Sequence, residues 1–141
     1  MLLMSFVILS TAVLIAIIFH AYNITKIKTV IKKTNGKINS LHDLHLVKEA
    51  INLSMKLAVY YIIFFILLIV ILAVLVLNRM LGQAALILFL FGIITLIVGL
   101  IGRKYETKIR KMEVKSDDPK LKETFERYIK QWTEPRLQLP E

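Results

Sequence analysis

The residues of this sequence with the clearest capacity for chemistry are two histidines and a glutamate that a helix would place on one side. His42, His45 and Glu49 stand at positions i, i+3 and i+7, a spacing that follows the helical repeat of about 3.6 residues. Two imidazole nitrogens and a carboxylate oxygen can bind a zinc or iron ion. The pattern offers no fourth ligand, and a solvated polar helix face accounts for the same residues. The sequence therefore leaves a metal site and a plain polar surface as alternatives.

Other signatures of cofactors and catalysis are missing from the sequence. The third histidine, His20, has no second histidine at matching depth with which to bind haem, and we predict no cofactor. The absence of cysteine excludes disulfides, thiolate metal sites and cysteine nucleophiles. There is no glycine-rich phosphate loop, no Ser–His–Asp pattern and no pair of catalytic carboxylates. We therefore expect a protein that is not an enzyme.

Three long uncharged segments must position any functional residue, and they dominate the 141-residue chain, which is 57% hydrophobic. They cover residues 2–19, 57–77 and 84–101, and each has about the length that crosses a bilayer as a helix. The second has no polar face, unlike a core helix of a soluble protein. The first lacks the positive start and cleavage site of a signal peptide, so we expect it to remain as an anchor. The sequence predicts an all-α integral membrane protein with three transmembrane helices.

Positive charges predict the orientation of these helices. All of the 19 Lys and Arg residues except Arg79 lie between the first and second segments or after the third. Short, positively charged connections stay on the cytosolic side of a membrane. We expect a multi-pass protein of the plasma or bacterial inner membrane, with its N-terminus outside and its C-terminus in the cytosol. The net charge of +9 then favours anionic lipid headgroups as partners and disfavours nucleic acid.

The helices are expected to continue beyond the membrane. Asn35-Gly36 ends a continuation of the first helix. Ser40 and Asp43 form a capping box that starts the second helix near Leu41. The third helix continues toward residue 114. Residues 1–115 are thus predicted to form a transmembrane bundle with a cytosolic helical stalk.

Residues 116–141 are predicted to form a short cytosolic amphipathic helix and an extended tail. Asp118 and Pro119 provide a helix-start signal. The apolar face of the helix consists of Leu121, Phe125, Tyr128, Ile129 and Trp132. The mixed charge of its polar face disfavours a dedicated lipid-binding helix, which would be rich in Lys and Arg. The apolar face either docks on a partner protein or folds back on the stalk.

Small residues on one side of the first and third segments predict close helix contacts. The first segment carries Ser5, Ala12 and Ala16, and the third carries Gly92, Thr95, Gly99 and Gly102. The contacts can form within this chain or with another chain.

These features predict a non-catalytic accessory subunit that packs against other subunits of a membrane complex, while three alternatives stay open. One is a homo-oligomeric pore or motor-like ring. Its three spans, outside N-terminus and cytosolic helix extensions are similar to ExbB/MotA-type motor proteins in architecture only, because no motif of that family is present. Another is a membrane-insertase-like protein, although the sequence shows no polar groove within the membrane. The last is a metal-binding membrane protein.

Overall fold

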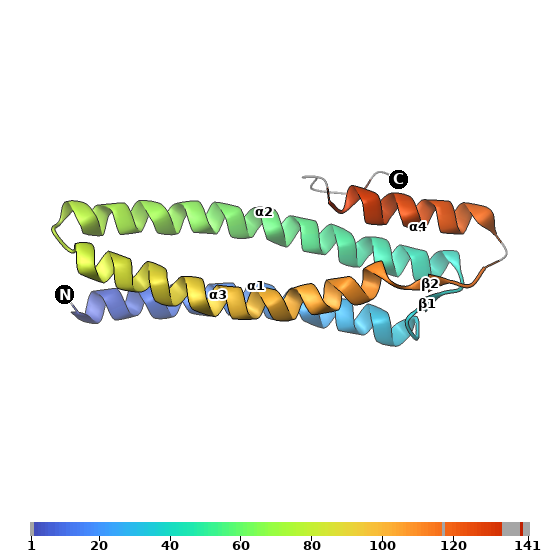
Figure 1. Ribbon diagram of the computed structural model, residues 1–141, viewed down its shortest axis with the longest axis horizontal. Coiled ribbons are helices and arrows are strands. Elements are labelled where there is room, and N and C mark those ends of the chain that lie inside the picture. Colours follow the sequence, from blue (N-terminus) through green and yellow to red (C-terminus); the bar gives the residue numbers. More distant parts are fainter. Residues whose placement is uncertain (1, 117, 134–138, 140–141) are drawn as a thin grey trace.

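The computed structural model describes residues 2–116, 118–133 and 139, and it consists mainly of three long helices lying side by side (Figure 1). The chain reverses its direction between successive long helices, and a short fourth helix follows (Figure 1). The helices are α1 (Leu2–Lys33), α2 (Leu41–Leu77), α3 (Leu81–Arg110) and α4 (Pro119–Gln131). The expectation of three helices long and apolar enough to cross a membrane is confirmed.

Local signals set the start of α2. The Ser40 side chain accepts a hydrogen bond from the backbone N–H of Asp43 at 3.2 Å. The Asp43 carboxylate in turn accepts one from the backbone N–H of Asn39 at 2.9 Å. This reciprocal capping satisfies donors at the helix end that would otherwise lack partners. From there, α2 runs unbroken for 37 residues through its charged part into the apolar span.

The end of α1 is a left-handed turn. Asn35 and Gly36 have φ angles of 50° and 72°, which these two residue types adopt more readily than others. The Gly36 N–H donates to the Ile31 carbonyl at 3.0 Å and the Asn35 N–H to the Lys32 carbonyl at 3.4 Å. This pair of bonds is the Schellman pattern, which closes the helix and redirects the chain toward α2.

A two-residue parallel strand pair ties the exits of α1 and α3 together. Strand β1 (Lys37–Ile38) pairs with β2 (Glu113–Val114), with Lys37 opposite Glu113. The Ile38 side chain is fully buried, so the pairing also closes one end of the apolar core. The short strands hold the connection before α2 against the segment that leads to α4.

The buried apolar residues form two clusters along the bundle. The membrane cluster joins the three spans through residues such as Ala16, Leu72 and Phe91. The stalk cluster joins residues 20–33, 41–56 and 102–112 with α4, through residues such as Ile51 and Ile109. We call this second region the stalk. Most large apolar side chains of the spans are exposed, as expected where lipid is the solvent.

Candidate functional site

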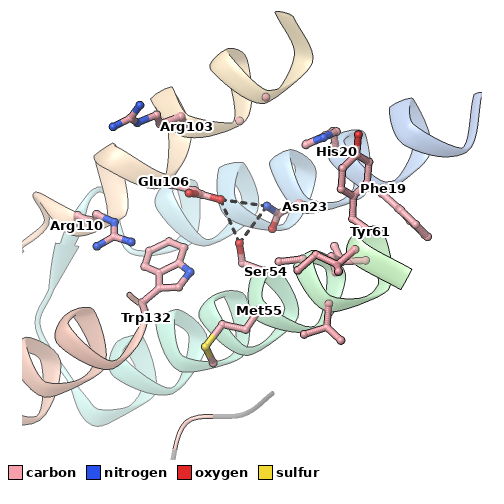
Figure 2. A pocket seen from close by; sticks show the side chains of 16 residues that line it. Phe19, His20, Asn23, Ser54, Met55, Tyr61, Arg103, Glu106, Arg110 and Trp132 are labelled. Atoms are coloured by element: carbon pink, nitrogen blue, oxygen red, sulfur yellow. Dashed lines mark hydrogen bonds between the residues drawn. The ribbon is translucent and has the colours of Figure 1, made fainter. Parts of the chain in front are cut away.

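A cavity of about 590 Å³ lies between α2 and α3 where the apolar spans meet the stalk, and we call it the boundary groove (Figure 2). Helix α1 contributes Phe19, His20 and Asn23, which lie between the walls formed by the other two helices. The walls and the stalk end of the groove include Ala58, Tyr61, Gly99, Arg103, Arg110 and Trp132. The groove therefore combines an apolar lining toward the membrane with charged groups toward the stalk.

Short side chains create this space. Gly99 on α3 has no atom within 4 Å of the place where a Cβ would stand, and Ala58 faces the groove from α2. Gly102 has a different role, because a Cβ there would lie 3.9 Å from Nδ1 of His20. This is ordinary van der Waals distance, so α1 and α3 are in direct contact at Gly102, whereas Gly99 and Ala58 leave a gap between α2 and α3.

Three polar side chains, one from each long helix, bond to one another at the base of the groove. The Asn23 Nδ2 group donates to Ser54 Oγ at 3.1 Å and to Glu106 Oε1 at 3.5 Å. The Ser54 hydroxyl donates to Glu106 Oε1 at 3.2 Å. Asn23 and Ser54 are buried, and the buried Oδ1 of Asn23 accepts no hydrogen bond from the described residues. We call these residues the polar cluster.

The sequence interpretation missed the polar cluster, although a signal was present. Ser54 interrupts the buried stripe of α2 between Ile51 and Met55, and Glu106 lies between the buried positions Gly102 and Ile109 of α3. A polar residue within an apolar stripe needs a partner from another element. The identity of that partner depends on how the helices are aligned, which periodicity alone does not reveal.

Arg103 and Arg110 place positive charge along the α3 side of the groove. They lie seven residues apart, which is about 10 Å along a helix. Within the described part of the chain, neither forms an ion pair with a carboxylate. The guanidinium carbon of Arg110 lies 4.6 Å from the ring centroid of Trp132, close enough for a cation–π contact. The two guanidinium groups therefore retain most of their capacity to bind an anion.

Aromatic contacts close the membrane end of the groove. The His20 and Tyr61 rings meet edge to face with centroids 5.5 Å apart. One turn farther along α2, Phe64 lies 6.2 Å from Phe91 of α3. At the opposite end the groove is bounded by Trp132, directly after α4. The groove thus has an end wall on each side.

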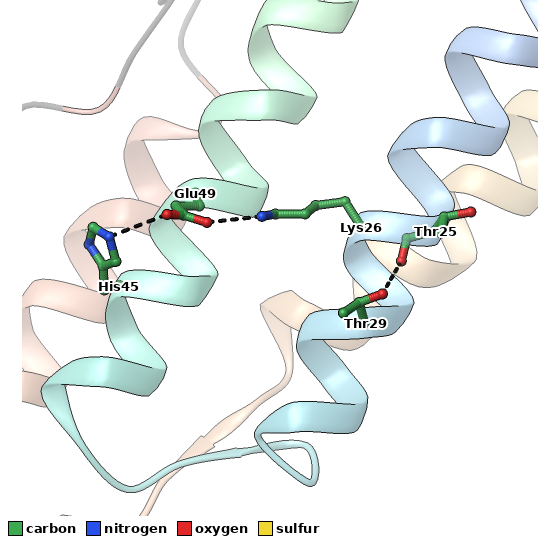
Figure 3. Close-up of polar contacts among 5 residues, drawn as sticks. All are labelled: Thr25, Lys26, Thr29, His45 and Glu49. Carbon is green, nitrogen blue, oxygen red and sulfur yellow. Dashed lines mark hydrogen bonds and ion pairs between the residues drawn. The ribbon is translucent and has the colours of Figure 1, made fainter.

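The residues predicted to bind a metal do not converge on one site. His45 Nε2 lies 3.3 Å from Glu49 Oε1, while Lys26 Nζ of α1 lies 2.9 Å from Glu49 Oε2 (Figure 3). Glu49 lies in the charged part of α2, and the hydrogen bond from Lys26 holds its pKa below the usual value. His42 is exposed. Among the described residues, no three His, Asp or Glu side chains are placed to hold a metal ion.

The predicted packing residues separate into two groups. Ala12 and Ala16 of α1 are buried in the membrane cluster, and Gly102 of α3 is buried against His20. Ser5 donates a hydrogen bond to Gln83 Oε1 at 2.6 Å. By contrast, Gly92 is exposed, and Thr95 and Gly99 are half-buried. The first-span face therefore packs within the chain, whereas part of the third-span face stays uncovered.

The uncovered part of α3 carries a shallow, open depression on its surface, which we call the α3 hollow. It is lined by Leu88, Phe89, Gly92, Ile93, Leu96 and Ile97. An added Cβ at Gly92 would meet no atom within 4 Å. The hollow is thus a purely apolar depression near the middle of the third span.

The apolar face of α4 packs against the chain itself. Helix α4 runs alongside the stalk part of α2 (Figure 1). Its side chains Leu121, Phe125, Tyr128 and Trp132 are buried in the stalk cluster, and Ile129 is partly buried there. Of the two alternatives for this face, folding back on the stalk is the arrangement in the structure. A partner protein would reach the face only after α4 had been displaced.

Comparisons with known proteins give no assignment. No family model matches the chain, and no curated protein or solved structure matches it. Function has to be inferred from the residues and geometry of the boundary groove, the α3 hollow and the stalk.

Proposed function

We propose that the chain is a non-catalytic accessory subunit that packs against a transmembrane helix of another subunit through the α3 hollow. The observation that carries this proposal is the hollow itself. It lies on the exposed surface of α3, its lining is entirely apolar, and Gly92 is among its lining residues. Nothing within the described part of the chain fills it.

The physics of association in lipid supports this role. Transmembrane helices gain little from hydrophobic burial, because lipid is as apolar as their side chains. Close packing decides whether they associate, and a glycine flanked by larger side chains provides a hole for a neighbouring side chain. The bulky flanks at Leu88, Phe89 and Leu96 give the α3 hollow this form.

The proposed orientation has the N-terminus outside and the stalk in the cytosol of a cell that carries the protein in its plasma or inner membrane. The support is the distribution of charge. In the sequence, every Lys and Arg except Arg79 lies between the first and second spans or after the third, and basic segments favour the cytosolic side with its anionic leaflet.

Filling the hollow tests the proposed function. A Gly92→Leu variant is compared with Ala73→Leu, which places the same final side chain at an exposed position of α2. Tagged full-length chains are purified from their own cells in mild detergent. We expect wild type and Ala73→Leu to retain co-purifying membrane subunits. In Gly92→Leu, the amount of co-purifying subunit should fall on the order of tenfold or more, and a tenfold fall is equivalent to about 1.4 kcal/mol of binding free energy. Full retention by Gly92→Leu contradicts the proposal.

The alternatives predict different results in the same experiment. A homo-oligomeric pore or ring gives a complex of defined size that contains only this chain. An insertase-like protein needs polar groups free to meet a client polypeptide, yet Asn23, Ser54 and Glu106 bond chiefly to one another. We therefore favour the accessory subunit over these alternatives.

A further inference from the structure

We infer that the boundary groove binds one anionic phospholipid, whose phosphate lies at Arg103 and Arg110 and whose acyl chain follows the apolar wall past Ala58 and Ile62. This site differs from the α3 hollow and does not depend on any partner subunit. It requires only that the three apolar helices span a bilayer.

The shape of the groove favours a ligand that enters from the bilayer. Helix α1 closes one side, and α2 and α3 form the walls. Tyr61 and Trp132 lie at the two ends. No described residue lines the side opposite α1. Because the flanking surfaces of α2 and α3 are apolar and exposed, that open side faces lipid.

The first of the two charges, that of Arg103, lies at the depth of lipid headgroups, and Arg110 follows about 10 Å farther along the helix toward the stalk. Arg103 follows the last residue of the third uncharged segment, Ile101, by two positions, about 3 Å along a helix. That distance places its guanidinium in the headgroup layer, which extends several ångströms beyond the hydrocarbon. Guanidinium groups bind phosphate oxygens through two parallel hydrogen bonds. Since no described carboxylate pairs with either arginine, a phosphate has no internal competitor.

Glu106 does not cancel this attraction. It lies between the two arginines in sequence, and its Oε1 accepts hydrogen bonds from Asn23 and Ser54 at the base of the groove. Two cations and one anion leave a positive excess. The two arginines therefore favour a ligand with negative charge.

The lining also distinguishes a lipid from a polypeptide. A peptide segment in this position needs partners for its backbone N–H and C=O groups. The polar cluster offers a backbone carbonyl no free donor, because the Asn23 amide and the Ser54 hydroxyl already donate within the cluster. An acyl chain needs no such partners, and Phe19, Leu57 and Ile62 provide an apolar wall for it.

A lipid titration tests this inference on the full-length chain. The protein is delipidated in detergent, and native mass spectrometry follows its binding of phosphatidylglycerol or phosphatidylcholine with the same acyl chains. We expect one tightly bound phosphatidylglycerol molecule per chain and weaker binding of phosphatidylcholine. The double variant Arg103→Gln/Arg110→Gln should weaken phosphatidylglycerol binding on the order of tenfold.

Matched variants separate the groove from general attraction to a basic protein. Lys104→Gln/Lys108→Gln removes the same charge from exposed positions of α3 that do not line the groove. It should change binding by less than about twofold. Ala58→Phe fills the apolar wall without changing charge and should weaken both lipids. Thermal unfolding in the same detergent verifies that each variant is folded.

Several outcomes overturn the inference. Equal losses in the lysine and arginine double variants indicate non-specific attraction. Unchanged lipid binding in folded Ala58→Phe shows that the acyl chain does not lie in the groove. Displacement of the lipid by inorganic phosphate indicates a site for a soluble anion. A peptide that occupies the groove and excludes lipid favours a polypeptide ligand. Gly92→Leu should bind lipid normally, so failure of the lipid site and failure of the proposed function are separable.

Discussion

Among single residues, Ser54 of α2 forms hydrogen bonds to both of the other long helices, α1 and α3. Its hydroxyl accepts from Asn23 and donates to Glu106. A buried polar group that loses its partner keeps the cost of having left water. The polar cluster therefore contributes to the alignment of α1, α2 and α3 as well as to stability.

Replacement of Ser54 by alanine should destabilise the folded chain by about 1–2 kcal/mol, because Asn23 loses its shorter bond and Glu106 loses a donor. The measurement is unfolding in a fixed detergent with increasing denaturant. Ser10→Ala is the control, since the exposed Ser10 hydroxyl bonds only to carbonyls of its own helix. An equal effect of both substitutions shows that the connection between helices contributes nothing.

The metal hypothesis shows what sequence can and cannot reveal at this scale. Helical spacing correctly placed His45 beside Glu49. It did not reveal Lys26, which comes from α1 and occupies the other carboxylate oxygen. Contacts within one helix follow from its period, whereas contacts between helices depend on their alignment.

At the scale of elements, three helix ends were readable because they depend on local chemistry. The prediction that the third helix continues toward residue 114 was wrong, because α3 ends at Arg110 and residues 113–114 pair with β1 as strand β2. The capping pair Ser40 and Asp43, the Asn35-Gly36 stop and the Asp118-Pro119 start all appear where expected. The β1–β2 pair was not predicted, since two residues per strand are too few to show alternation. The boundary groove was also missed, because it arises from Gly99 and Ala58 on different helices.

Helix α4 should depend on its apolar contacts for its structure. It has 13 residues, and a helix of about this length is marginal in water alone. Phe125 is buried in the stalk cluster, so Phe125→Ala should cost about 3–5 kcal/mol. We expect amide hydrogens of residues 119–131 to exchange faster in this variant, while those of the spans change little.

Glu123→Ala is the matched control, because Glu123 is exposed on the same helix. Its exchange pattern should resemble that of the wild type. If the amide hydrogens of α4 remain fully protected from exchange in Phe125→Ala, the contacts of Phe125 with the stalk do not stabilise α4. Such a result also means that α4 is not easily displaced, so its apolar face would not become available to a partner.

The whole molecule consists of two regions built for different solvents. In the spans, core packing is limited to a seam that includes Leu68 and Ile87, while most large side chains face outward. In the stalk, apolar residues of all four helices are enclosed. The boundary groove lies where these two regions meet. Its mixed lining fits that position, because a boundary between hydrocarbon and headgroups favours side chains that combine apolar and polar parts.

The orientation of the molecule requires added reporters. Native glycosylation sequons begin at Asn23 and Asn52, but Asn23 is buried and Asn52 Oδ1 accepts a hydrogen bond from the Leu139 N–H at 2.7 Å. Lack of modification at these sites therefore says little about orientation. Since the chain has no cysteine, single cysteines introduced at exposed positions provide cleaner reporters.

Asn78→Cys places a thiol in the turn between α2 and α3, and Lys122→Cys places one on the exposed face of α4. With a membrane-impermeant maleimide, we expect Asn78→Cys to react in intact cells and Lys122→Cys only after permeabilisation. The physical reason is that the basic stalk is retained on the cytosolic side. Labelling of both variants after permeabilisation controls for thiol exposure. The reverse pattern in intact cells inverts the proposed orientation, and it also moves the boundary groove to the outer leaflet.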